Sequence, residues 1–268
     1  EDSIDIVVLG DSHTETSVSD KPALGLKNLS FRGESLFLTY YKLKQILKVN
    51  PHVKNVVLAY SFHSLSEFQD NQLEKVLKDY YWLLDKEGLS YVDYNVNNID
   101  AILKEANSQL FKWSLSYIKN TPYFLLTGGY RKMEVLNLSK KTSAKRIDGH
   151  YFKNSGKEVQ NISSLQEEYL EKIVRLCVDS NISLTFLNTP LHTSYYENIP
   201  PVFVSKHYEK MEGYAASYPA NVHYLDLSWI IKKDEYFHDG DHLNNIGGPV
   251  FQSALVKKLI DLNVVKAS

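Results

Sequence analysis

The sequence holds a single cysteine, Cys177, among 268 residues. A disulfide within the chain and a zinc site built on cysteine ligands are therefore both excluded. Long apolar runs are also lacking. The longest, such as residues 6–9 and 56–59, are far shorter than the roughly 20 residues that a helix needs to cross a bilayer.

Neither sign of charge is in excess, because 30 Lys and Arg residues face 32 Asp and Glu residues, for a net charge of -2. Such a balance creates no field that would attract nucleic acid or an anionic membrane, so we expect no nucleic-acid partner. The loop after the first predicted strand lacks both Gly-x-Gly-x-x-Gly and Gly-x-x-x-x-Gly-Lys. A nucleotide-binding α/β protein is therefore disfavoured.

The chain starts at Glu1 instead of Met, and the first predicted strand follows almost at once. Either a signal or anchor segment has been removed or the chain has been trimmed. We expect an extracytoplasmic protein, periplasmic or at the cell surface, with membrane anchoring through a removed N-terminal segment.

Strand and helix patterns alternate along the chain. Residues 4–9 read Ile-Asp-Ile-Val-Val-Leu and stop at Gly10, which is typical of a buried parallel strand. Further segments with strand patterns are 24–29, 55–60, 182–187 and 222–225. Segments with helical patterns are 33–49, 67–86 (ended by Gly88), 97–117, 163–180, 203–218 and 248–262. This order predicts an α/β fold whose mainly parallel sheet is covered on both faces, with its site at the carboxyl ends of the strands.

One part of the chain shows no period. Residues 131–158 are polar and basic, and we predict a solvated loop there in preference to a substrate-binding segment. We interpret residues 1–268 as one domain that carries an insertion or cap at about residues 90–160.

The first segment with candidate catalytic residues is Gly10-Asp11-Ser12-His13, directly after the first strand. Gly10 tolerates the backbone of a tight turn, which would hold the Ser12 hydroxyl at the edge of the sheet. The backbone N–H of Ser12 can point at a developing oxyanion. This position predicts that Ser12 is a nucleophile.

The second segment is Asp239-Gly240-Asp241-His242, shortly before the last helix. Asp239, three residues before His242, can accept the imidazole N–H while the other ring nitrogen faces Ser12. Asp241 is the rival acid, but its place next to His242 gives a less natural geometry. We therefore predict His242 as general base and Asp239 as the acid that orients it.

Together these segments resemble the SGNH/GDSL hydrolase superfamily, which carries Gly-Asp-Ser in its first block, as at Gly10-Asp11-Ser12, and Asp-x-x-His in its last, as from Asp239 to His242. The resemblance implies a three-layer α/β/α sandwich around a parallel sheet of about five strands. It also implies a serine nucleophile and a catalytic triad. We expect no cofactor, and no metal, since no His-x-x-x-His pattern or carboxylate cluster suggests one.

The middle blocks of that family supply a Gly N–H and an Asn side chain to the oxyanion hole. Gly33, within residues 30–35, matches the Gly block. At the Asn block the chain departs from the family, because residues 61–64 read Ser-Phe-His-Ser and place His63 at the Asn position. The resemblance thus implies an oxyanion hole of Ser12, Gly33 and His63, with an imidazole N–H as the third donor. Losing one such donor costs about 10²–10³ in rate.

Other polar residues fall near the predicted edge of the sheet. His13 follows the nucleophile, Arg32 precedes Gly33, and His192 follows a strand, so we predict that these three bind substrate. Three other histidines have no candidate catalytic or ligand partner at a characteristic spacing, and we expect them to be structural or on the surface. They are His150, His207 and His223.

These residues predict two-step acyl transfer from an acylated small molecule or polysaccharide. If water accepts the acyl group, the protein is an esterase, and the family resemblance and the 19 Tyr residues favour a carbohydrate O-acetylesterase. If a sugar hydroxyl accepts it, the protein is an O-acyltransferase of a cell-surface polysaccharide. A third reading, favoured by the missing Asn, is a catalytically weak binding or scaffold protein on the same fold.

Overall fold

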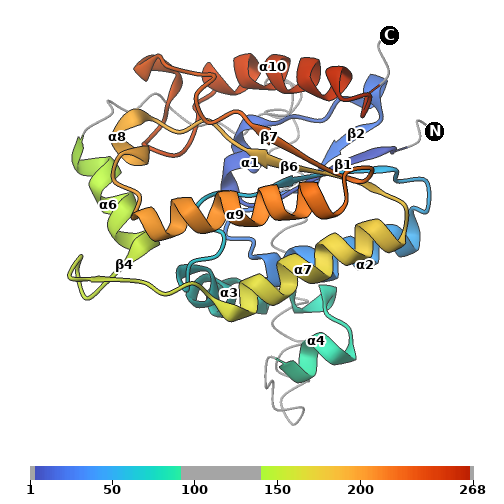
Figure 1. The fold of residues 1–268 in the computed structure, drawn as a ribbon, viewed down its shortest axis with the longest axis horizontal. Coiled ribbons are helices and arrows are strands. Elements are labelled where there is room, and N and C mark those ends of the chain that lie inside the picture. The colour runs from blue at the N-terminus through green and yellow to red at the C-terminus, as the bar shows by residue number, and fades with distance from the viewer. Residues whose placement is uncertain (1–3, 92–139, 266–268) are drawn as a thin grey trace.

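A parallel sheet of five strands lies at the centre of the protein (Figure 1). The structure, a computed structural model, describes residues 4–91 and 140–265. In spatial order the strands are β2 (Leu26–Asn28), β1 (Ile6–Leu9), β3 (Asn55–Ala59), β6 (Ser183–Asn188) and β7 (Val222–Asp226). Every neighbouring pair is parallel. The predicted α/β fold class, a three-layer sandwich with a parallel central sheet, is confirmed.

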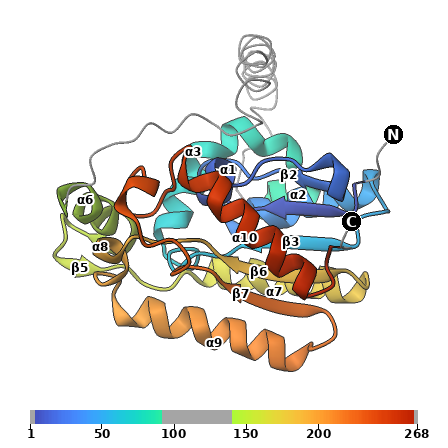
Figure 2. The same ribbon diagram turned by 90° about the horizontal axis from the view of Figure 1, so that it is seen from above.

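Alternate residues of β1 face opposite layers of helices. Val7 and Leu9 belong to one core, and Ile6 and Val8 to the other. The first core is covered by α2 (Leu36–Val49), α3 (Phe68–Tyr80), α7 (Ser164–Asp179) and α9 (Pro201–Ser217). The second is covered by α10 (Gly247–Asp261), with α1 (Ser12–Ser17) beside it (Figures 1 and 2). Burial on both faces explains why the strands are nearly continuous apolar runs.

The order of the strands determines where the site lies. The chain goes from β1 outward to β2 and then returns past β1 to β3, so the direction of winding reverses between β1 and β3. Loops that leave the carboxyl ends of strands on either side of such a reversal diverge and leave room for a site. Here those loops begin at Gly10 and at Tyr60.

Helix α6 (Lys140–Tyr151) corrects one prediction, because it lies where we predicted a solvated loop at residues 131–158. A short antiparallel hairpin follows it, formed by β4 (Phe152–Lys153) and β5 (Glu158–Val159). Ile147 and Tyr151 are buried in a third core that ties α6 to α8 (Thr193–Tyr196) and to the start of α9.

The buried face of α6 explains why its period was missed. Ser143 and His150 are buried together with the apolar residues, and Arg146 contacts buried carboxylates. A helix whose inner face is largely polar shows little hydrophobic period, although its residues recur at helical spacing. The predicted helix at 97–117 and residues 92–139 of the predicted cap lie outside the described residues.

Two other boundaries differ from the prediction. The helix expected at 67–86 ends at Tyr80, and a turn of 3₁₀ helix (Tyr81–Leu83) leads into α4 (Lys86–Tyr91). Gly88 therefore lies inside a helix instead of ending one, and it allows a close approach, since a Cβ there would lie 2.7 Å from the Tyr41 ring. The strand expected at 24–29 is confined to β2, because Pro22–Leu24 form a 3₁₀ turn.

In the part of the chain that the structure describes, no helix is long and apolar enough to cross a membrane.

Candidate active site

The turn after β1 brings Ser12 to the edge of the sheet. Gly10 has a φ of +143°, and a Cβ at this position would lie 2.5 Å from the Cβ of Ala59 on β3. Only glycine fits there, because a side chain would collide with the neighbouring strand and strain the backbone. Asp11 then caps α1 by accepting the N–H of His13 at 3.0 Å. Ser12 is thus the first residue of α1.

Residues 230 positions apart in the sequence meet at this edge. The Oγ of Ser12 lies 2.8 Å from the Nε2 of His242. The Nδ1 of His242 lies 2.9 Å and 3.0 Å from the two carboxylate oxygens of Asp239. Ser12 is partly exposed, whereas His242 and Asp239 are buried. This arrangement lets the imidazole accept the hydroxyl proton while the carboxylate keeps the other ring nitrogen protonated.

Asp239, and not Asp241, holds His242 in place. Besides the ring, Asp239 accepts the backbone N–H of His242 at 2.8 Å and that of Asp241 at 3.1 Å, which closes the tight turn. The closest oxygen of Asp241 is 3.5 Å from the Nδ1 of His242. Burial alone would lower the pKa of His242, but Asp241 and Asp239 outweigh burial and raise it.

Arg146 belongs to the same cluster of side chains and was missed by the sequence analysis. Its guanidinium donates two hydrogen bonds to Asp241, from Nε to Oδ1 at 2.8 Å and from Nη2 to Oδ2 at 2.6 Å. Its Nε is also 3.9 Å from the Oδ2 of Asp239. Burial would raise the pKa of Asp241, but His242 and Arg146 outweigh burial and hold it well below its usual value. The available signal was the four-residue spacing of Arg146 and His150, one helical turn apart.

We predicted that His13 binds substrate, which would place it in an accessible pocket. In the structure it is buried, with only 2% of its surface exposed. Its Nδ1 lies 2.7 Å from the Oδ1 of Asp11, and its Nε2 lies 3.1 Å from the Oδ2 of Asp241. Its ring stacks on that of His242 with 4.7 Å between centroids and 4° between planes. His13 therefore contacts the predicted base instead of the solvent.

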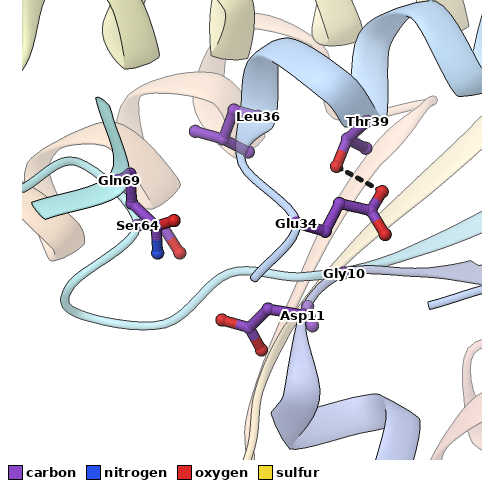
Figure 3. A pocket seen from close by; sticks show the side chains of 8 residues that line it. Gly10, Asp11, Glu34, Leu36, Thr39, Ser64 and Gln69 are labelled. Atoms are coloured by element: carbon purple, nitrogen blue, oxygen red, sulfur yellow. Dashed lines mark hydrogen bonds between the residues drawn. The ribbon is translucent and has the colours of Figure 1, made fainter. Parts of the chain in front are cut away.

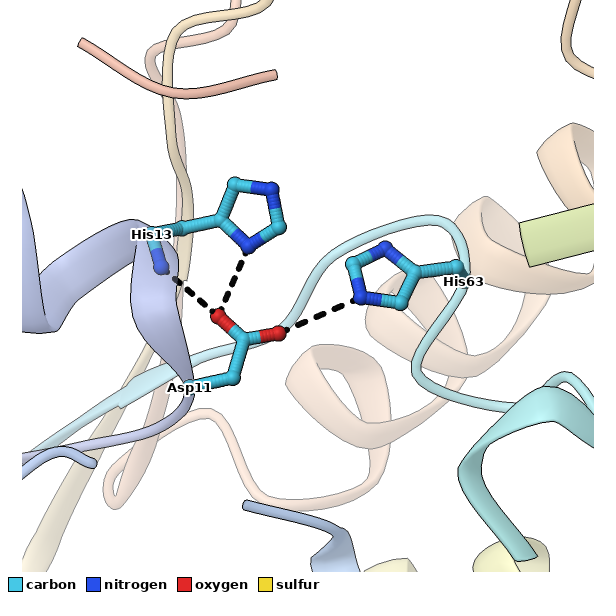
Figure 4. A group of neighbouring side chains, drawn as sticks. All are labelled: Asp11, His13 and His63. Carbon is cyan, nitrogen blue, oxygen red and sulfur yellow. Dashed lines mark hydrogen bonds and ion pairs between the residues drawn. The ribbon is translucent and has the colours of Figure 1, made fainter. Parts of the chain in front are cut away.

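His63 lies on the other side of Asp11 (Figure 4), with its Nε2 3.2 Å from the Oδ2 of that carboxylate. Burial lowers the pKa of His63. A neutral imidazole has one N–H, and here that N–H is directed to Asp11. The structure therefore does not provide the oxyanion donor that we expected from His63.

His150, which we expected to be structural or on the surface, is buried and also belongs to this cluster. Its ring stacks on His63 at 4.3 Å, and its Nδ1 lies 2.6 Å from the hydroxyl of Tyr195. Burial and the nearby His63 lower its pKa well below the usual value. His207 is buried in α9 against Tyr60, in keeping with a structural role.

The other predicted residues lie around this cluster. Gly33, with a φ of +75°, lies in the loop after β2. A hydrogen bond from the Phe31 N–H to the Gly10 carbonyl, at 3.1 Å, joins this loop to the turn that carries Ser12. The side chain of Arg32 is 64% exposed and 3.9 Å from Glu15. His192 caps α8, with its Nδ1 2.7 Å from the Ser194 hydroxyl and its Nε2 3.1 Å from Asp234.

Two sets of side chains in the described residues bring three candidate metal donors within 4.8 Å of one another. They are Asp11, His13 and His63, and His13, Asp241 and His242. Two ligands that each lie about 2.0–2.1 Å from a zinc ion are about 3.3 Å apart in a tetrahedral site. Asp11 and His13 are closer, at 2.7 Å, which is the length of a charge-assisted hydrogen bond. We therefore interpret the Asp11–His13 contact as a hydrogen bond.

A small cavity lies behind the nucleophile turn (Figure 3). It measures about 10 Å³, enough for one water molecule. Its lining comprises Gly10, Asp11, Glu34, Leu36, Thr39, Ala59, Ser64 and Gln69. A larger groove of about 510 Å³ runs between α6, the β4–β5 hairpin and α8. The residues that line these two spaces do not include Ser12 or His242, so we assign neither space to the reacting group.

No family model matches the chain, and no curated protein matches it at a significant level. The fold and the site nevertheless define a class, an α/β protein whose parallel sheet presents a Ser-His-Asp arrangement at its carboxyl edge.

Proposed function

We propose that this protein is a serine ester hydrolase of the SGNH type. The observation that carries the proposal is the 2.8 Å contact between the Oγ of Ser12 and the Nε2 of His242, with Asp239 on the far side of the ring. The Gly-Asp-Ser and Asp-x-x-His segments support the same reading, since they occupy opposite ends of the chain and meet only in the folded protein.

In the proposed reaction, His242 takes the proton of Ser12 as its Oγ attacks the ester carbonyl. The tetrahedral oxyanion is held by the N–H of Ser12, because the first N–H groups of a helix have no acceptor within it. The N–H of Gly33 is the second donor. His242 then gives its proton to the departing alcohol, and the C–O bond breaks to leave an acyl group on Ser12.

A water molecule completes the cycle. His242 takes one of its protons, the resulting hydroxide attacks the acyl carbonyl, and the proton returns to Ser12 as the carboxylic acid leaves. Because the N–H of His63 is directed to Asp11, we propose an oxyanion hole of two backbone donors, without the side-chain donor that the family resemblance implies. Such a site would be slower by about 10²–10³ than one with three donors.

An acetylated carbohydrate is the substrate class that we propose. Trp229 follows β7 and Tyr196 ends α8, so both lie toward the carboxyl edge of the sheet where Ser12 lies. Their rings meet edge to face at 4.4 Å, and Trp229 is 42% exposed. Exposed aromatic faces at this edge suit sugar rings.

The test is hydrolysis of p-nitrophenyl acetate by the wild type, by Ser12→Ala and by the control Ser253→Ala. Ser253 is an exposed serine on α10, bonded to the Pro249 carbonyl, so its loss removes a hydroxyl away from the site. We expect activity in the wild type and the control and none in Ser12→Ala. Equal rates in all three proteins would refute Ser12 as the nucleophile.

A serine-reactive fluorophosphonate provides the second measurement. It should label the wild type and Ser253→Ala but not Ser12→Ala. Labelling without hydrolysis would point to the alternative in which a sugar hydroxyl accepts the acyl group, and adding a polysaccharide acceptor would then restore turnover. Absence of both labelling and hydrolysis would favour the binding protein.

A further inference from the structure

The proposed reaction does not use His13, although this residue lies directly behind the base. Its ring is buried and parallel to that of His242 at 4.7 Å. The groups that face it come from three separate segments of the chain. They are Asp11 of the same turn, Asp241 and His242 of the loop before α10, and His63 of the loop after β3.

The two ring nitrogens of His13 face two different carboxylates. Nδ1 lies 2.7 Å from Asp11 and Nε2 lies 3.1 Å from Asp241. An ionised carboxylate only accepts hydrogen bonds, and a neutral imidazole donates only one. With a neutral ring, one nitrogen lone pair would therefore face a buried carboxylate. Both contacts are favourable only when His13 carries a proton on each nitrogen.

The charges around His13 agree with this assignment. Burial would lower the pKa of His13, but Asp11 and Asp241 outweigh it and raise the pKa to about 10. Burial would likewise raise the pKa of Asp11, and the nearby His13 and His63 instead hold it well below its usual value. Burial lowers the pKa values of His63 and His150, which favours their neutral forms. Arg146 binds the same carboxylate of Asp241 from the side of α6.

We infer that His13 is a permanent imidazolium whose charge, stacked on His242, opposes the protonation of that base. The consequence for catalysis rests on the proposed function, whereas the charge of His13 does not. His242 has carboxylate oxygens of Asp239 at 2.9 Å and Asp241 at 3.5 Å, and these alone would favour its protonated form. A cation stacked on the ring opposes them.

During the proposed reaction this opposition acts at two stages. In the free protein it lowers the fraction of His242 that is protonated, so that more of the base can accept the Ser12 proton. Once His242 is protonated, two parallel cations face each other, so the imidazolium is a stronger acid and passes its proton to the departing alcohol more readily. His13 touches neither Ser12 nor the substrate in this scheme and is a positioning residue.

The variant that tests the inference is His13→Gln, which keeps a side-chain N–H donor and removes the positive charge. A unit charge at this ring separation should change the pKa of His242 by about 0.6 unit if the surroundings resemble bulk water, and by about 2.6 units at an effective dielectric constant of about 20. We expect the pKa of His242 to rise by an amount within these limits. The acid limb of kcat/KM for p-nitrophenyl acetate should move to higher pH with it.

The decisive measurement needs no catalysis. NMR of protein with ¹⁵N-labelled histidine reports the protonation of each ring nitrogen as pH changes. In the wild type, both nitrogens of His13 should stay protonated from about pH 5 to pH 8, because its pKa is raised to about 10. The control is His52→Gln, because His52 is exposed in the loop before β3 and its loss should leave the titration of His242 unchanged.

Each result bears on the inference. A neutral His13 anywhere in that pH range would overturn it, and this result comes from the wild type even if His13→Gln does not fold. A His242 pKa that moves by less than about 0.3 unit in folded His13→Gln would overturn it as well. If instead Ser12→Ala keeps full hydrolysis while His13 stays charged, the proposed function fails and the charge assignment stands.

Discussion

Replacing Arg146 by Gln should destabilise the protein strongly, because it breaks a paired charge inside the cluster. The Arg146 guanidinium makes two hydrogen bonds to Asp241, whose side chain has no exposed surface. Without Arg146, that carboxylate remains buried and keeps His13 as its close cationic partner. Glutamine can replace at most one of the two bonds and none of the charge.

The size of the effect follows from these contacts. Removing one partner of a fully buried ion pair costs about 3–5 kcal/mol. The side chain of Arg146 is 32% exposed and Asp241 keeps His13, so we expect a cost below that range, about 2–3 kcal/mol. In a protein of this size, that loss should lower Tm by about 5–10 °C.

The assay is urea unfolding followed by circular dichroism, together with calorimetry. The matched control is Arg175→Gln. Arg175 pairs with Glu171 at 2.7 Å on the surface of α7, where the two side chains are 65% and 39% exposed. An exposed pair of this kind contributes less than about 1 kcal/mol, so the control should remain close to the wild type.

The reasoning would be refuted if Arg146→Gln lost no more stability than Arg175→Gln. A double-mutant cycle with Asp241→Asn sharpens the test. Once Asp241 is neutral, Arg146→Gln should cost far less than it does alone, because contacting residues are strongly non-additive. Equal costs in both backgrounds would mean that the ion pair does not hold α6 against the site.

Two further predictions concern the acid of the triad and the only thiol. Asp239→Asn should lower kcat for p-nitrophenyl acetate by about 10³–10⁴ with little change in KM, because the amide favours the wrong tautomer of His242; the surface control Asp261→Asn should not. A loss below tenfold would shift the role to Asp241. Cys177 has no exposed surface and burial raises the pKa of its thiol to about 12, so a disulfide reagent should modify it only at the rate of unfolding. Rapid modification of the native protein would contradict the buried position in α7.

Much of the layered fold is visible in the sequence because its signals are local. The apolar runs that became β1 and β3 are buried on both faces, so burial by itself makes them recognisable. Ser12 and His242 were found in the same way, since each follows a strand or precedes a helix with a short, specific polar segment. No long-range information is needed for such patterns.

Helix α6 shows where local patterns fail. Its inner face carries Arg146 and His150 as well as Ile147 and Tyr151, so its apolar residues do not form a clear stripe. A charged residue resembles a solvated one until its partner is known. The partner of Arg146 is Asp241, which lies 95 positions further along the chain.

His13 and His63 illustrate the same limit at single residues. From the sequence, His13 was a candidate for binding substrate and His63 a candidate oxyanion donor. The charge of His13 depends on Asp241, which is 228 residues away, and the N–H of His63 is directed to Asp11, which is 52 residues before it in the chain. The sequence specifies which side chains can donate or accept protons, but only the folded sheet, which brings its loops to one edge, decides which of them meet.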